Sequence, residues 1–216
     1  MTKSVLVFMK YPEPGQVKTR LAASMGSDRA AELYRCWIGD VLGVLQPLRD
    51  TTHIVGYFVG APAEAFREWH GLADSWRPQP PGDLGQRLSA GFELGFQLGG
   101  PVLAVGTDCL EMDGDLLLAA FEDLSRHDAV FGPTPDGGYY LVGLAMPRPA
   151  LFHSIRWSSP FTLADHLERC REQGWSVSLL PARHDIDTEQ DWHDYLRRTE
   201  RSKSGADRGS RRSDPQ

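Results

Sequence analysis

The sequence has few cysteines and no long hydrophobic run. Its three cysteines, Cys36, Cys109 and Cys170, are too few for a disulfide framework, and no CxxC pair is present. Sparse, unpaired cysteines favour a reducing compartment, so we expect a cytoplasmic protein. No apolar stretch approaches the roughly 18 residues of a membrane span, and the amino-terminal apolar segment is too short for the core of a signal peptide. We therefore expect no membrane association.

Positive charge is also scarce. The chain carries 23 Lys and Arg against 29 Asp and Glu, a net charge of -6. Non-specific binding to a nucleic-acid backbone needs a basic surface, so we expect no nucleic-acid partner. The tail, residues 200–216, is the exception, with five basic residues, three acidic ones and no large apolar side chain. Because such a segment has little to bury, we expect it to be disordered and residues 1–199 to form the folded domain.

The rest of the chain has a globular composition, 41% hydrophobic with six Trp, and a length that suits one α/β domain. Short apolar segments predict strands over residues 4–9, 53–59, 101–106, 128–132, 139–144 and 175–180. Helical spacing of apolar residues predicts helices over 27–45, 62–70, 83–98, 113–126, 160–173 and 188–198. This alternation predicts a mostly parallel central sheet with helices on both faces.

The loop after the first predicted strand could bind an anion. Ligands of open α/β sheets bind beyond the carboxyl ends of the strands, and this loop contains Lys10, Gly15, Lys18 and Arg20. Gly15 permits close backbone approach, and the cations could hold phosphates. The loop is not a P-loop, because no GKS or GKT follows the glycine. A solvated basic loop is the alternative interpretation.

Carboxylates follow two other predicted strands. Asp108 comes directly after the third strand, where it could reach a hard cation or simply cap a turn. Asp185 and Asp187 alternate in an extended segment, so both could face one ion, or they could cap the last helix together with Thr188. The separate carboxylates suit a shared divalent metal, whereas the scattered histidines disfavour zinc. Cys109 could be a nucleophile, but without a neighbouring His it is better interpreted as a small buried thiol.

Paired glycines mark a fourth cluster. Gly137 and Gly138 follow Asp136 and precede Tyr139. The glycines would let the backbone approach a ligand closely, but they also suit an ordinary hairpin turn.

Taken in order, the motifs point to a family. They are FMKYPEPGQVKTRL, GDLGQRL, GTDCLEM, DGGYYLVGL, Trp157 followed by Ser158, and DIDTEQDW, spanning residues 8–192. The set resembles the DUF2064 family, glycosyltransferase-like proteins of the nucleotide-diphospho-sugar transferase superfamily that are associated with radical-SAM or arsenosugar chemistry. The resemblance implies a GT-A, Rossmann-like fold. At longer range the chain is similar to molybdenum-cofactor and phospholactate nucleotidyltransferases.

The resemblance also implies roles for individual residues. Asp108 and Asp187 would bind Mg²⁺ or Mn²⁺. The residues expected at the nucleotide are Lys10, Gly15, Lys18, Arg20, Asp83, Gly85 and Arg87. The residues expected at the acceptor are Gly137, Gly138, Tyr139 and Trp157. The catalytic set would be Lys18, Arg20, Asp108 and Asp136. Leu110 replaces a proline that is usual in the family, and Glu111 is an extra carboxylate.

Together these features predict a metal-dependent transferase that takes a nucleotide donor and a small-molecule acceptor. Nucleotidyl transfer from an NTP to a phosphorylated acceptor is slightly favoured, and glycosyl transfer from an NDP-sugar, with Asp136 as base, is the alternative. A non-catalytic nucleotide-binding protein is the second alternative. We expect Asp108 and Asp187 to converge on one divalent ion. We also expect Lys18 and Arg20 to project into an open cleft facing Asp108 and not to pair with carboxylates.

Overall fold

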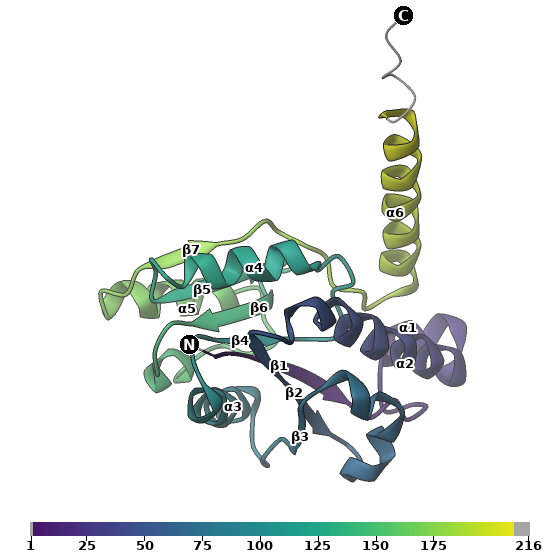
Figure 1. The fold of residues 1–216 in the computed structure, drawn as a ribbon. Coiled ribbons are helices and arrows are strands. Elements are labelled where there is room, and N and C mark those ends of the chain that lie inside the picture. The colour runs from purple at the N-terminus through teal and green to yellow at the C-terminus, as the bar shows by residue number, and fades with distance from the viewer. Residues whose placement is uncertain (1, 210–216) are drawn as a thin grey trace, which may run out of the picture.

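A seven-stranded sheet forms the centre of the molecule (Figure 1). The structure, a computed structural model, describes residues 2–209. The strand order is β3-β2-β1-β4-β6-β5-β7, and β6 runs antiparallel to β4 and β5 while the other pairs are parallel. The strands are β1 (Lys3–Lys10), β2 (Thr52–Val59), β3 (Ser75–Pro78), β4 (Val102–Val105), β5 (Ala129–Pro133), β6 (Tyr139–Leu144) and β7 (Val177–Leu179). The expected mostly parallel sheet is confirmed.

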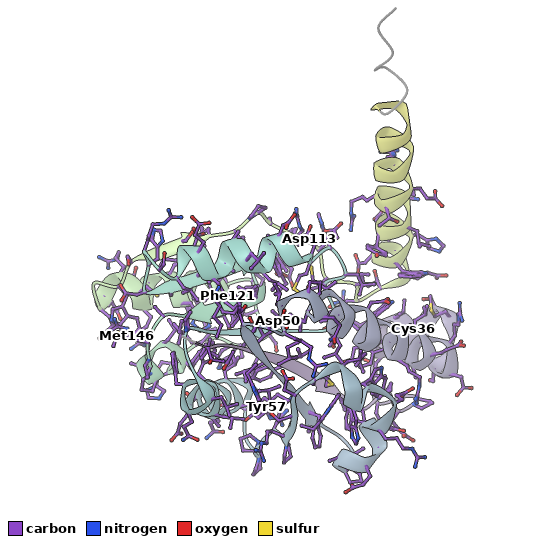
Figure 2. All side chains as sticks on the ribbon, viewed as in Figure 1. Cys36, Asp50, Tyr57, Asp113, Phe121 and Met146 are labelled. Carbon is purple, nitrogen blue, oxygen red and sulfur yellow. The ribbon has the colours of Figure 1, made fainter. Side chains whose placement is uncertain are left out.

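Helices cover both faces of this sheet. One face carries α1 (Thr19–Met25), α2 (Ser27–Val44), α4 (Gly114–Asp123) and the 3₁₀ segments η1 (Gln46–Leu48) and η2 (Ala63–Leu72). The other carries α3 (Leu84–Leu98), α5 (Thr162–Glu172) and the 3₁₀ segment η3 (Pro149–Phe152). Trp37 and Phe66 are buried on the first face and Phe131 on the second. Tyr57 lies on the second face, where Figure 2 shows it near α3. The two-layered covering explains why the strands are apolar on both sides.

Besides the short 3₁₀ segments η1 and η3, one strand and one α-helix were not expected from the sequence. The sequence predicts no strand over residues 71–82, which contain three prolines, but β3 forms there as an edge strand. An edge strand tolerates proline because one side of its backbone needs no ladder partner. Trp76 of β3 covers Gly56 of β2, where a Cβ atom would come within 2.5 Å of the indole ring. Helix α1, the other unexpected element, is short and buries Leu21.

Helix α6 (Glu189–Gly209) extends from the body at its amino-terminal end (Figure 1). Its first turns are held by Trp192, whose ring lies 5.5 Å from that of Trp37, and by an ion pair between Arg198 and Glu111. The helix continues past residue 199, where the disordered tail was expected to begin. Its backbone hydrogen bonds form within the helix itself, so these residues need no apolar partner to be helical. Residues 210–216 of that tail lie outside the described residues. No helix in residues 2–209 is long and apolar enough to cross a membrane.

The strand order places a switch point between β1 and β4. From this point the chain proceeds to β2 and β3 on one side and to β6, β5 and β7 on the other. The loops that leave β1 and β4 therefore diverge, and ligands of open α/β sheets bind in the crevice between such loops. Lys10 ends β1 and Asp108 follows β4, so both lie at this crevice.

Gly85 allows α3 to pack closely on the rest of the second face. A Cβ atom at Gly85 would lie 2.8 Å from the carbonyl oxygen of Phe152 and 3.0 Å from Trp157. We expect Gly85→Ala to lower the free energy of unfolding by about 1–3 kcal/mol, as overpacking does. Gly43→Ala in α2 is the matched control, because nothing lies within 4 Å of its Cβ position. The control should raise stability by about 0.5–1 kcal/mol. Urea unfolding measures both, and equal effects would contradict this packing role.

Candidate active site at the switch point

An ammonium group lies at the centre of the candidate site. Lys18 Nζ is 2.8 Å from Asp108 Oδ1 and 3.1 Å from Asp187 Oδ1, and it donates a hydrogen bond of 2.6 Å to the carbonyl oxygen of Ile186. The Lys18 side chain is only 5% exposed. Asp108 and Asp187 therefore lie close together with a protein cation between them, and their convergence on one divalent ion stays a prediction.

The local structure fixes Lys18 in this position. Its backbone is left-handed, with φ 46° and ψ 46°, at the residue that precedes α1. A residue with a Cβ atom adopts that conformation at a cost that its surroundings must offset. Burial by itself lowers the pKa of Lys18, but the charges of Asp108 and Asp187 act in the other direction and leave that pKa above its ordinary value. Lys18 is therefore charged at neutral pH.

The other two cations of the same loop are arranged differently. Arg20 is 70% exposed and contacts Asp187 Oδ2 at 3.3 Å. Lys10 donates a hydrogen bond of 2.7 Å to the carbonyl oxygen of Gln16. The expectation that Lys18 and Arg20 would face an open cleft without carboxylate partners is wrong for Lys18, which is buried between two aspartates, and wrong in part for Arg20, which lines a hollow but pairs with Asp187. The loop folds back onto β4 and the 185–188 segment, which the sequence alone does not show.

Two adjoining hollows surround this cluster. One, of about 270 Å³, is lined by Lys18, Arg20, Asp108 and Asp187 among others. The second, of about 370 Å³, contains Asp108, Arg87, Gln79 and Tyr139. Both include Lys10, Tyr34 and Asp108, so they form one cleft at the carboxyl ends of β1 and β4. The cleft therefore unites residues expected at the metal, at the nucleotide and at the acceptor.

Arg87 differs from the other cations of the cleft. Its Nε atom is buried without a hydrogen-bond partner, and within residues 2–209 no carboxylate pairs with its guanidinium. The side chain comes from the first turns of α3 and lines the larger hollow. A buried donor without a partner is costly unless a ligand satisfies it. Arg87 is thus a free cation for an anionic or carbonyl group of a ligand.

Tyr34 of α2 contributes to the cleft, although no sequence motif pointed to it. Its hydroxyl is 2.7 Å from the Thr107 hydroxyl and accepts a hydrogen bond from the Lys10 backbone N–H at 3.2 Å. Burial raises the pKa of Tyr34 to about 12, with Asp108 adding to the effect. Tyr34 therefore ties the end of β1 to the loop after β4 as a neutral phenol.

The carboxylates of the cleft fit a divalent cation that also binds phosphate. Asp108 and Asp187 already bind one cation between them, the Lys18 ammonium. Within the described chain no group of three or more His, Cys, Asp and Glu side chains is arranged as a metal cluster. Mg²⁺ is commonly held by one or two carboxylates together with substrate phosphates, so two aspartates are a sufficient protein contribution.

Asp185 is the further acidic residue at this position. Burial, and then the charges of Asp108 and Asp187, raise the pKa of Asp185 to about 7, while Lys18 opposes the shift. The DIDT spacing was the sequence signal for this residue, and the structure places Asp185 in the electrostatic field of the cluster.

Three of the expected site residues line a separate cavity, and Asp136, Gly137 and Gly138 line neither hollow of the cleft. Asp83, Gly85 and Trp157 line a separate cavity of about 990 Å³ between α3 and residues 144–157. Asp83 accepts the Gln86 N–H and caps α3, while Gly85 packs on Trp157. The GDLGQRL motif is therefore divided between this cavity and the cleft, which Arg87 lines, because successive residues of a helix point to different sides. Gly15 has φ 77° in the β1 loop and lines neither hollow of the cleft.

The paired glycines form a tight turn. Asp136 Oδ1 accepts hydrogen bonds from the Thr134 hydroxyl at 2.5 Å and from the Gly138 N–H at 3.1 Å. Gly137 has φ 88°, and a Cβ atom there would collide with the backbone of Pro160. These contacts support the turn interpretation of this motif, since one oxygen of the Asp136 carboxylate is engaged within the turn.

Tyr139 presents its ring to the cleft and its hydroxyl to the interior. The hydroxyl lies 3.1 Å from His166 Nε2, and His166 Nδ1 lies 3.1 Å from the carbonyl oxygen of Leu151. The carbonyl can only accept, so Nδ1 carries the proton and Tyr139 donates to Nε2. The Tyr139 hydroxyl is therefore committed to positioning the ring.

Cys109 and Glu111, whose roles the sequence left open, have structural roles. Burial raises the pKa of the Cys109 thiol to about 12, as suits a small buried thiol and not a nucleophile. Glu111 pairs with Arg198 of α6 and also accepts the His184 backbone N–H at 3.2 Å. This carboxylate therefore fastens α6 to the loop after β4.

The comparisons with known proteins agree with this architecture. The family model for DUF2064, described as uncharacterized protein conserved in bacteria, matches residues 45–159. The chain belongs to the DUF2064 family. A crystal structure from Desulfovibrio desulfuricans G20, provisionally assigned as a nucleotide-diphospho-sugar transferase, is 35% identical, with a TM-score of 0.78 over 87% of this chain and 84% of that one. No curated protein matches the chain.

More distant structures share the fold of this DUF2064 protein. The 4-diphosphocytidyl-2C-methyl-D-erythritol synthase of Anaerococcus prevotii is 12% identical, with a TM-score of 0.58 over 90% of this chain and 99% of that one. The glucosyl-3-phosphoglycerate synthase of Mycobacterium tuberculosis, solved with Mn²⁺ and UDP, is 10% identical, with a TM-score of 0.53 over 89% and 75%. The expected GT-A-like fold is confirmed.

The buried His166 predicts a pH dependence of stability. Burial lowers the pKa of His166 to about 4, from an ordinary value of 6.5. The unfolded chain therefore binds the proton more tightly, and stability should fall as pH decreases from about 6.5 to 4, by up to about 3 kcal/mol. We expect His166→Gln to flatten this loss in urea unfolding over pH 4 to 7.

The comparison is between two slopes, so a general destabilisation by the substitution does not affect it. The raised pKa of Asp185 acts with the opposite sign between pH 4 and 7, but it is common to both proteins. Parallel curves for wild type and variant would contradict the neutral, buried state of His166.

Proposed function

We propose that this DUF2064 protein is a metal-assisted transferase that binds a nucleotide donor in the cleft at the switch point. The observation that carries the proposal is the Lys18 ammonium held between Asp108 and Asp187 beside the unpaired Arg87. An anion-binding loop and a pair of convergent carboxylates are the parts that transfer from a nucleotide requires.

Each side of the cleft has its own task in this proposal. Lys18, Arg20 and Lys10 face the smaller hollow and bind the donor phosphates. The larger hollow, with Arg87 and Gln79, receives the nucleoside part of the donor. The Tyr139 ring, fixed by His166, forms the wall on the β6 side, where the acceptor enters. Positioning and electrostatic stabilisation of the phosphates supply most of the rate.

Asp108 and Asp187 would hold Mg²⁺ or Mn²⁺. When bound, the ion would supply positive charge that offsets the negative charge developing on the donor phosphates. Asp185, close to both carboxylates, is the further residue that could complete the protein side of that site.

Nucleotidyl transfer is the favoured reaction. An acceptor phosphate that attacks the α-phosphorus of an NTP, with pyrophosphate leaving, is already an anion and needs no general base. Glycosyl transfer to a hydroxyl with inversion needs such a base, and Asp136 was the candidate. One oxygen of the Asp136 carboxylate, Oδ1, accepts hydrogen bonds from Thr134 and Gly138 within its own turn, so only the other oxygen could act as that base. Glycosyl transfer from an NDP-sugar therefore remains the second candidate.

A thermal-shift screen of NTPs and NDP-sugars, with and without Mg²⁺, tests the proposal. A donor at 100 times its Kd adds about 2.7 kcal/mol to stability, which for a chain of this size raises Tm by about 5–10 °C. We expect an NTP to give the larger shift, and only with Mg²⁺. A shift by NDP-sugars alone would favour glycosyl transfer, and the absence of any shift would contradict nucleotide use.

Arg87 gives a more specific prediction. Arg87→Gln should weaken the binding of the donor found in the screen by about tenfold to a hundredfold, since it removes a charged hydrogen bond. Arg171→Gln is the control, because it removes the same charge from a surface pair with Glu168 on α5. Isothermal titration calorimetry measures both affinities. An unchanged affinity in Arg87→Gln would remove this residue from the nucleotide site.

A further inference from the structure

We propose that the Lys18 ammonium is a built-in counter-ion that keeps divalent cations out of the site until a donor draws it away. In the free protein it occupies the cation position between Asp108 and Asp187. The inference rests on the proposed function only in naming a nucleotide as the ligand that draws it away. It assigns a regulation to the site, in which metal and nucleotide bind together or not at all.

The surroundings of the ammonium are those of a cation site. Two carboxylate oxygens and the carbonyl oxygen of Ile186 lie within 3.1 Å of Nζ. The rings of Tyr34 and Trp37 have their centroids 5.9 Å and 5.5 Å from it. Aromatic faces add attraction for a positive charge. A metal ion that used Asp108 and Asp187 would compete with Lys18 for the same oxygens.

The charge balance of the free protein disfavours the binding of a divalent ion by itself. Lys18 and Arg20 together compensate Asp108 and Asp187 in the free protein. A divalent ion added to this neutral set gains little, because the oxygens it needs are already paired and the displaced ammonium would lose its partners. Donor phosphates make binding of the divalent ion favourable, since they attract the Lys18 ammonium away from the carboxylates and also supply ligands for the ion. The two ligands are then coupled, and the coupling is reciprocal.

The unfavourable backbone conformation of Lys18 is consistent with a side chain that changes position when a ligand binds. Its left-handed conformation precedes α1 directly, and the side chain is held by contacts with residues 108, 186 and 187, all of which are distant from it in the sequence. Release of those contacts removes what offsets the unfavourable backbone conformation. The side chain can then turn toward the hollow that Lys10 and Arg20 also line.

The test measures Mn²⁺ binding without any nucleotide, by electron paramagnetic resonance of free Mn²⁺ at neutral pH. We expect Lys18→Met to bind Mn²⁺ at least about tenfold more tightly than the wild type, because the carboxylates become available. Lys10→Met is the matched control. Lys10 lines the same cleft but bonds to the Gln16 carbonyl and not to a carboxylate. It should change the Mn²⁺ affinity by less than about threefold, through screened charge alone.

A charge-retaining variant and a stability measurement complete the test. Lys18→Arg should bind Mn²⁺ as weakly as the wild type. Mn²⁺ should raise the Tm of Lys18→Met by more than it raises that of the wild type, and a Lys18→Met protein that folds only with Mn²⁺ also supports the inference. It is overturned if Lys18→Met binds Mn²⁺ no more tightly than the wild type, or fails to fold with or without Mn²⁺. Failure of the proposed function would appear separately, as a missing nucleotide response in the thermal-shift screen.

Discussion

The ion cluster of Lys18 holds together three segments that are far apart in the sequence. One is the loop that follows β1, the second is the end of β4, and the third is the 185–188 segment before α6. Lys18 Nζ contacts Asp108 in the second segment and Ile186 and Asp187 in the third. Because the lysine is almost fully buried, removing both carboxylates would leave its charge without compensation, which is costly in a protein interior. The shape of the cleft therefore depends on this one ammonium group.

The rest of the fold brings these segments into range. The parallel pairing of β1 with β4 puts their carboxyl ends side by side at the switch point. Tyr34 joins the two loops through Thr107 and the backbone of Lys10. The Ile186 N–H donates to the Asp108 carbonyl oxygen at 2.9 Å, so the third segment is also tied by its backbone. Glu111 and Trp37 then fix α6, which follows that segment. Each of the three segments that form the charged cluster is thus also held in place by contacts outside the cluster.

The cleft has two electrostatic halves with different states in the free protein. Around Asp108 and Asp187 the charges are compensated by Lys18 and Arg20. Around Arg87 they are not, since its guanidinium has no carboxylate partner in the described chain. An anionic ligand therefore meets one cation that is free and one that must first leave its partners. An anionic ligand can therefore bind first at Arg87 and then displace Lys18 from its carboxylates. This order results from the fold, which pairs Lys18 with aspartates and leaves Arg87 without a carboxylate partner in the described chain.

The sequence by itself determined the sheet, the position of the site and most of its charged residues. Apolar strand segments and helical spacing predicted the alternation of elements, and the rule that ligands bind beyond the carboxyl ends of strands selected Lys18, Arg20, Asp108 and Asp187. These inferences depend on local patterns, which a chain carries whatever its tertiary contacts. The motif GDLGQRL shows the limit of such patterns. Arg87 lines the cleft while Asp83 and Gly85 line another cavity, because a helix directs neighbouring residues to different sides.

Only the tertiary structure decided which charges are paired. The sequence suggested that Lys18 would await a phosphate, and the fold places its ammonium on two aspartates instead. The same holds for Glu111, which anchors α6 through Arg198. Edge strand β3 formed in a segment that contains three prolines, and Trp76 of this strand covers Gly56 on the neighbouring strand. In each case the deciding contact joins residues whose separation in space is fixed by the packing of the whole chain, and no local pattern of residues records it.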